Sequence, residues 1–190
     1  MSDKSKGIHK GRTYAKIIGL VFVANILLSA IMIFLNYPTE AHRSVARQME
    51  AFTNRMMSGE DFSKIMDSQE YMSLASSAEA NYMNIASFAL LGLNIIVSVA
   101  IVGAIYYYLR RNRTTTKPVL ATTLLASAGG LLPLILAAYG TTWFVGIQQP
   151  GIGHVIFMLF IGVVIGPLVN AIIARIFEWY YNRKHSFVID

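Results

Sequence analysis

The chain has 190 residues, of which 55% are hydrophobic and only 14% are charged, whereas soluble domains carry about a quarter charged residues. It has no cysteine, which excludes disulfides, thiolate metal sites and cysteine nucleophiles. The net charge of +6 comes from basic residues beside hydrophobic stretches. We therefore expect the lipid bilayer as a partner, and no nucleic acid.

Residues 1–16 form a basic N-terminal segment, and residues 17–36 are the first predicted transmembrane span. Positions 17–35 carry no charge, and roughly 20 apolar helical residues cross a bilayer. The apolar core of a secretory signal is shorter and ends at a small-residue cleavage site. We therefore interpret this stretch as an uncleaved membrane helix.

Residues 37–81 form the only sizeable polar segment, for which the sequence predicts a pair of amphipathic helices. Val45, Met49, Phe52 and Met56 recur at helical spacing and form one apolar stripe. Residues 58–61 (Ser-Gly-Glu-Asp) break this helix before a second one begins. Because methionine packs adaptably, we interpret the stripe as an interaction surface.

The rest of the chain contains three further predicted spans. Residues 118–174 carry no Asp, Glu, Lys or Arg, which is enough apolar chain for two crossings and a turn. The predicted segments are a second span at 82–109, a basic loop at 110–117, a third span at 118–140, a turn at 141–151, a fourth span at 152–176 and a tail at 177–190.

The basic residues predict the orientation of the four spans. Twelve of the sixteen Lys and Arg lie in or next to the N-terminal segment, the 110–117 loop and the tail. An even number of spans places these three segments on one side of the membrane. By the positive-inside rule, both termini are cytoplasmic in a cell or inner membrane.

Two pairs of polar residues recur in the first two spans. Asn25 and Ser29 lie one turn apart, as do Asn94 and Ser98, and the residue numbers of Asn25 with Ser98 and of Ser29 with Asn94 both add to 123. Antiparallel helices place such residues at equal depth. We expect hydrogen bonds that hold the two helices together, and a polar path or pocket is the alternative.

The third and fourth spans have a similar register. Thr122 pairs with Asn170, the one amide in the last span, and every pair in this register adds to 292, which centres the turn near Gly146. Small residues let membrane helices approach closely, and a Thr–Asn pair bonds across them. The other pairs are Ala126 with Gly166 and Gly130 with Gly162.

Pro133 and Pro167 each remove one helical hydrogen bond, which predicts helix kinks near the middle of the bilayer. Transporters use backbone carbonyls released in this way to bind ions or substrates. Neighbouring groups also satisfy such carbonyls in ordinary membrane helices, and we expect this simpler role here.

The sequence therefore predicts an all-α integral membrane protein with an extracytoplasmic helical pair between spans one and two. We find no lysine, Asp or Glu inside a span and no histidine pair at depth, so we expect no enzyme, no cofactor and no metal site. We expect a non-catalytic protein that acts by association, as an accessory or assembly subunit of a larger membrane complex, with protein partners or as a homo-oligomer. The alternative is a small oligomeric transporter or channel that uses the polar residues and freed carbonyls at mid-depth.

Overall fold

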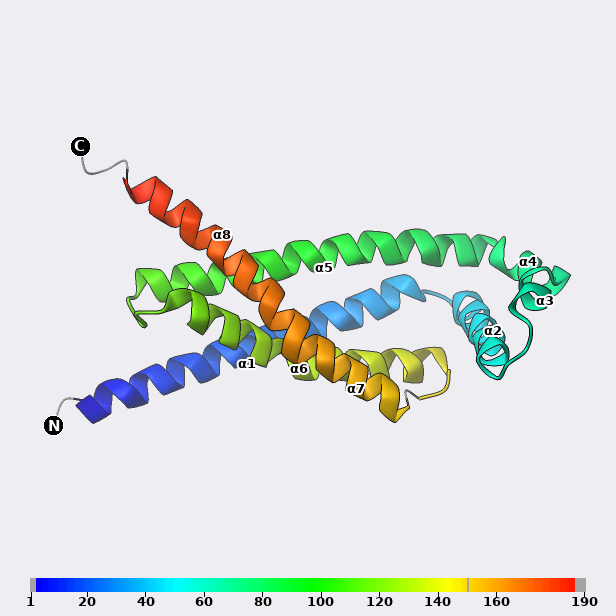
Figure 1. Ribbon diagram of the computed structural model, residues 1–190, viewed down its shortest axis with the longest axis horizontal. Coiled ribbons are helices and arrows are strands. Elements are labelled where there is room, and N and C mark those ends of the chain that lie inside the picture. Colours follow the sequence, from blue (N-terminus) through cyan, green and yellow to red (C-terminus); the bar gives the residue numbers. More distant parts are fainter. Residues whose placement is uncertain (1–2, 150, 187–190) are drawn as a thin grey trace. The chain divides into compact units, whose positions relative to one another are not determined.

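The computed structural model describes residues 3–149 and 151–186, and the side chains of residues 11–149 and 151–184. The chain is 87% helical, with no strand in the described part, which confirms the predicted all-α fold (Figure 1). Among the described residues, four helical stretches are long and apolar enough to cross a membrane: Gly11–Asn36, Ala78–Arg111, Pro118–Val145 and Ile152–Lys184.

The helices follow the predicted order, and each long helix extends beyond the predicted span at one or both ends. In chain order they are α1 (Asp3–Asn36), α2 (Glu40–Met57), α3 (Phe62–Met66), α4 (Gln69–Ala75), α5 (Ala78–Arg111), α6 (Pro118–Val145), α7 (Ile152–Phe160), the π-helical turn η1 (Ile161–Ile165) and α8 (Gly166–Ser186).

The chain divides into two compact units, and α1, α5 and α6 each contribute to both. The first unit comprises Met1–Leu28, Asn94–Leu136 and Gly151–Asp190. The second comprises Ser29–Leu93 and Ala137–Pro150.

The core of the first unit lies where α1, α5, α6 and α8 meet. Close helix contact here depends on glycine: a Cβ on Gly129 of α6 would lie 2.6 Å from Val21 of α1, and one on Gly103 of α5 would lie 2.6 Å from the ring of Phe177 of α8. Small residues at helix contacts are typical of membrane bundles. The core residues are Val21, Val102, Ile105, Leu109, Leu125, Ala126 and Ala174.

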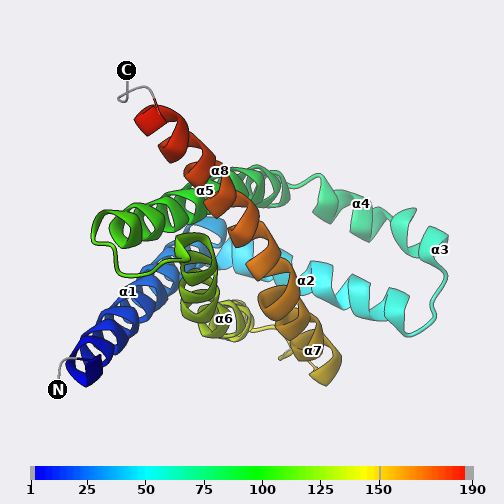
Figure 2. The same cartoon turned by 60° about the vertical axis from the view of Figure 1, so that its left-hand side comes forward.

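The second unit contains three short helices, α2, α3 and α4, in place of the predicted pair. In Figure 2, α3 and α4 run back along α2, and both contact it. The predicted second helix is split because two side chains each start a new helix. Asp61 accepts a hydrogen bond from Ser63 N–H (3.0 Å) at the start of α3, and Ser68 accepts one from Tyr71 N–H (3.2 Å) at the start of α4.

The connection between α6 and α7 begins later than the sequence predicted. Gly146 has a φ of +79°, the left-handed conformation that glycine adopts most readily after a helix. The backbone N–H groups of Gly146 and Ile147 both donate to Thr142 O, at 2.9 and 3.0 Å. Gly146 therefore ends α6 and is not the centre of the turn.

Candidate functional site

A small polar cavity lies inside the first unit, where α1, α5, α6 and α8 come together. Its volume is about 110 Å³, which is room for about three water molecules at roughly 30 Å³ each. Asn25, Ser98 and Asn170, from three different helices, supply polar side chains to its wall, each near the middle of its candidate span. The remaining lining residues are Val21, Ile101, Val102, Ala126 and Gly130.

Asn25 and Ser98 line the same cavity, but each makes its hydrogen bond within its own helix. Asn25 Nδ2 donates to Val21 O (2.8 Å), and Ser98 Oγ donates to Asn94 Oδ1 (3.2 Å). The predicted direct bond between Asn25 and Ser98 is therefore wrong, because a partner one turn away is nearer than the facing helix. Ser29 belongs to the second unit and Asn94 to the first, so the second pair stays a prediction.

The amide of Asn170 bonds to α6 at a different position from the predicted one. Its Nδ2 donates to Ser127 Oγ at 3.1 Å, whereas the sequence paired Asn170 with Thr122. Thr122 is fully buried, and its hydroxyl oxygen has no hydrogen-bond partner among the described residues. A buried hydroxyl without a partner costs about 1–3 kcal/mol. The buried hydroxyl of Thr122 therefore lowers the stability of the core.

The three glycines Gly130, Gly162 and Gly166 do not pack against the small residues with which the sequence paired them. A Cβ on Gly162 would lie 2.4 Å from Leu131 Cδ1, while nothing lies within 4 Å of one on Gly130. The atom nearest to a Cβ on Gly166 is a carbonyl oxygen of its own helical turn, at 3.5 Å. The predicted pairing of Gly130 with Gly162, and of Ala126 with Gly166, is therefore wrong. The physical reason is the later turn, which shifts every pair of facing residues.

The two prolines have different effects on their helices. Pro133 is fully buried, and α6 continues through it as an α-helix. Pro167 is the second residue of α8, one residue after the end of the π-helical turn η1, in which Gly166 N–H donates to Ile161 O. The missing N–H of Pro167 is thus accompanied by a widened turn, a feature that is frequent at functional sites.

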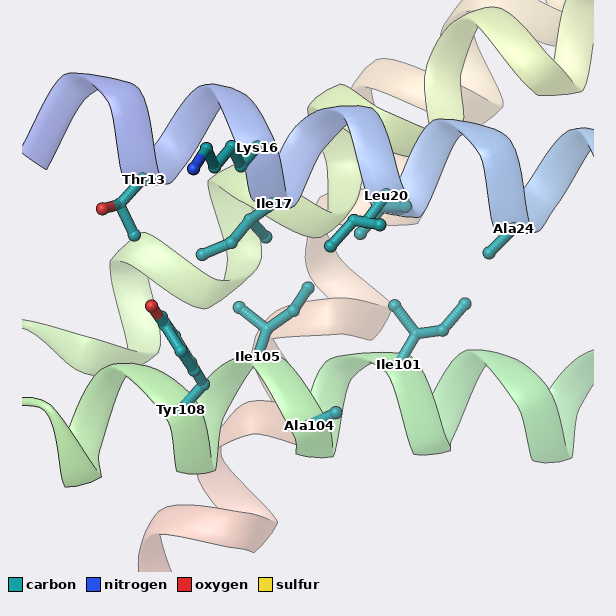
Figure 3. Close-up of a pocket in the computed structure, with 10 residues that line it drawn as sticks. Thr13, Lys16, Ile17, Leu20, Ala24, Ile101, Ala104, Ile105 and Tyr108 are labelled. Carbon is teal, nitrogen blue, oxygen red and sulfur yellow. The ribbon is translucent and has the colours of Figure 1, made fainter.

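A second, larger hollow is a slot in the first unit between α1 and α5 (Figure 3). Its volume is about 530 Å³. Lys16 and Tyr108 lie at one end of the slot and Ala24 at the other (Figure 3). The remaining lining residues are Thr13, Ile17, Leu20, Val21, Ile101, Ala104 and Ile105.

Neither Lys16 nor Tyr108 was predicted to be a site residue from the sequence. One signal was present, because their numbers add to 124 and so agree within one residue with the register of the Asn25–Ser98 pair. The space between them, in contrast, depends on how far apart the two helices pack. Only the tertiary structure contains that information.

The apolar stripe of α2 is largely internal to the second unit. Val45 is 8% exposed and Phe52 is 5% exposed, while Met49 and Met56 are half-buried. The ring of Phe52 packs edge-on against Tyr71 of α4, with 5.4 Å between centroids. The prediction that this stripe is a free interaction surface is therefore wrong, because α3 and α4 fold back onto α2.

The polar face of α2 is tied to the end of α6 within the second unit. Arg47 Nη1 donates to Val145 O at 3.0 Å, a carbonyl that the end of α6 leaves without a helical partner. Arg43 lies over the ring of Phe144, 4.9 Å from its centroid. Both arginines also pair with Glu40, and the hydrogen bond from Arg47 lowers the pKa of that carboxyl. This cluster fixes how α2 meets the α6 end.

Three large apolar side chains of the 37–81 segment are exposed although they lie outside the four candidate spans. Met57 is 82% exposed, Phe62 is 62% exposed and Met72 is 59% exposed. Met57 and Phe62 flank the turn between α2 and α3. Met57 and Met72 lie outside the helical stripe that the sequence predicted, and they were therefore not selected from the sequence.

Charged groups around the same turn pair with one another. Arg55 donates to both carboxylate oxygens of Glu60, at 2.8 and 2.6 Å, and this bonding lowers the pKa of Glu60. Hydrogen bonds from the hydroxyl and the backbone N–H of Ser63 lower the pKa of Asp61. In the part of the chain that the structure describes, no cluster of three or more His, Cys, Asp or Glu could hold a metal ion.

Comparison with protein families, curated proteins and solved structures gives no match, so the function is inferred from the chain's own residues.

Proposed function

We propose that this chain is a non-catalytic multi-span membrane protein that acts by association, as an accessory or assembly subunit of a larger membrane complex. Four helices that are long and apolar enough to span a bilayer support the membrane setting. The distribution of basic residues supports cytoplasmic termini, with the 37–81 segment on the opposite side.

The observation that carries the association proposal is the exposure of Met57, Phe62 and Met72 outside the candidate spans. The internal core of α2, α3 and α4 does not use these side chains, since Phe52 and Ile65 fill it at 5% and 1% exposure. Apolar side chains that remain exposed beside a packed core favour contact with another surface. Methionine adapts to the shape of a partner, which suits an assembly role.

The charges around this surface favour a protein partner over a lipid surface. Glu60 and Asp61 lie in the turn between Met57 and Phe62, and both carboxyl groups have lowered pKa values. Both carboxyl groups are therefore ionised at neutral pH. The charge of Glu60 is paired with Arg55, whereas Asp61 adds a negative charge that anionic lipid head groups repel. We expect the partner to present an apolar patch with basic residues at its rim.

Site-specific photocrosslinking in native membranes tests the proposal. A photoreactive amino acid at Met57 or Phe62 should give one discrete adduct with a different membrane protein, which should also co-purify with the unmodified chain. The same probe at Asn54, an exposed polar position on α2, is the matched control and should give no such adduct. Adducts with lipid alone, or equal adducts from all three positions, would contradict the proposal.

The polar cavity favours a second candidate function, a small oligomeric transporter or channel for neutral solutes. Asn25, Ser98 and Asn170 converge on it from three helices. Pro133 also supports a transporter or channel. It has no N–H to bond to Gly129 O, and Gly130, which directly follows Gly129, lines the cavity.

Flux through reconstituted vesicles tests this candidate. Asn25→Leu should reduce water or small-solute flux severalfold, because a larger apolar side chain fills a cavity of about 110 Å³. Leu27→Asn, at a 58% exposed position on α1, changes the same helix away from the cavity and should keep the flux. A parent protein with no flux above empty vesicles would remove this candidate. A crosslink between two copies of the chain, together with flux, would favour it over the subunit proposal.

A further inference from the structure

The slot between α1 and α5 is apolar along its length and basic at one end (Figure 3). Leu20, at its border, is 71% exposed, so the slot is open on the outside of the helix pair. Its walls belong to the candidate spans Gly11–Asn36 and Ala78–Arg111. In a membrane, the surroundings of this opening are lipid and not water.

Two alanines create the space in the slot. Ala24 on α1 and Ala104 on α5 lie among the larger side chains Leu20, Ile101 and Ile105. Larger residues at the alanine positions would interdigitate and fill the space, as side chains do in close-packed interiors. The resulting volume of about 530 Å³ falls within the range of roughly 300–1,000 Å³ that is typical of small-molecule sites.

The charge at the slot end selects the occupant. Lys16 is exposed at this end, and Arg12 lies one turn before it on α1. On α5, Arg110 and Arg111 follow Tyr108 directly. Basic pockets between membrane helices bind anionic head groups, and tyrosine belongs at head-group level.

We propose that this slot binds one acyl chain of an anionic phospholipid, whose phosphate is held by the Lys16 ammonium beside the Tyr108 hydroxyl. The acyl chain lies along the apolar walls toward Ala24 and gains van der Waals contacts with them. A helix from a second copy is the other occupant of suitable shape. This second helix is disfavoured, because its own basic residues would lie against those at the slot end. Residues 11–36 and 94–111 contain no acidic side chain that could pair with them.

Thermal unfolding of the full chain in detergent, with added phosphatidylglycerol or phosphatidylcholine, tests the site. Phosphatidylglycerol should stabilise the parent at lower concentration than phosphatidylcholine. Lys16→Gln should weaken phosphatidylglycerol binding about fivefold, which corresponds to about 1 kcal/mol for one basic residue at a lipid surface. Lys117→Gln removes the same charge from an exposed position outside the slot and should leave the affinity unchanged.

A second test of the lipid site fills the slot without changing its charge. Ala104→Leu should abolish stabilisation by phosphatidylglycerol, whereas Ala15→Leu, at an exposed alanine outside the slot, should keep it. Equal effects of Lys16→Gln and Lys117→Gln would show general surface attraction and overturn the proposal. It is also overturned if Ala104→Leu binds the lipid like the parent, or if Ala104→Leu converts a dimeric parent to a monomer in the absence of lipid.

Discussion

The unpartnered hydroxyl of Thr122 gives the sharpest test of how α6 packs. Thr122→Val replaces a buried hydroxyl with a methyl group of nearly the same size. Thr122 is 0% exposed and its oxygen has no hydrogen-bond partner among the described residues. Because such a hydroxyl costs about 1–3 kcal/mol, we expect Thr122→Val to raise the free energy of unfolding by about 1 kcal/mol.

The neighbouring residue provides a matched control. Thr123 is 7% exposed, and its Oγ1 donates to Val119 O at 2.9 Å. Thr123→Val makes the same chemical change but removes an existing hydrogen bond, which contributes about 0.5–1.5 kcal/mol. Both substitutions keep a β-branched side chain, so helix propensity changes little in either. The two variants should differ in stability by about 2 kcal/mol, with opposite signs relative to the parent.

Equilibrium unfolding in mixed micelles, followed by far-ultraviolet circular dichroism, measures both free energies. If Thr122→Val destabilises the protein as much as Thr123→Val does, the Thr122 hydroxyl has a partner. That partner would be either the backbone carbonyl one turn earlier in α6 or the Asn170 amide that the sequence predicted. A stability equal to that of the parent would also refute the stated cost of the buried hydroxyl.

Three further outcomes are expected. Gly129→Ala should lower the free energy of unfolding by about 1–3 kcal/mol, because its methyl group would lie 2.6 Å from side-chain atoms of α1. Gly130→Ala should be neutral or stabilising, because no atom lies within 4 Å of the added methyl group. Equal losses of stability in the two variants would contradict this packing. The Glu60 carboxyl has a pKa below its ordinary value in the folded state, so it stabilises the fold above the unfolded-state pKa, and this contribution is lost as pH falls through the folded-state value. The melting temperature of Glu60→Gln should therefore fall less than that of the parent as pH is lowered from about 6 to about 3, and parallel curves would argue against the arginine pair. Because the chain has no cysteine, single cysteines report topology directly: an impermeant reagent applied from outside should label one at Ser58 and not one at Thr116, and the reverse pattern would refute cytoplasmic termini.

Much of the fold follows from the sequence through local rules. Uncharged stretches such as residues 118–174 determine that the chain forms long apolar helices, because only helices satisfy their own backbone in an apolar setting. The equal depth of Asn25 and Ser98, which line one cavity, also followed from helix rise alone. Both features depend on spacing along one or two helices, and such spacing is visible in the sequence.

The contacts between helices were decided only by the tertiary structure. The bonding of Asn170 to Ser127 instead of Thr122 depends on where α6 ends, and Gly146 ends it in a left-handed conformation that shifts every facing residue. The burial of Phe52 depends on α3 and α4 folding back onto α2, which no periodicity within α2 encodes. The slot needs both the small side chains of Ala24 and Ala104 and the way in which α1 and α5 pack within the first unit, and the sequence shows only the alanines.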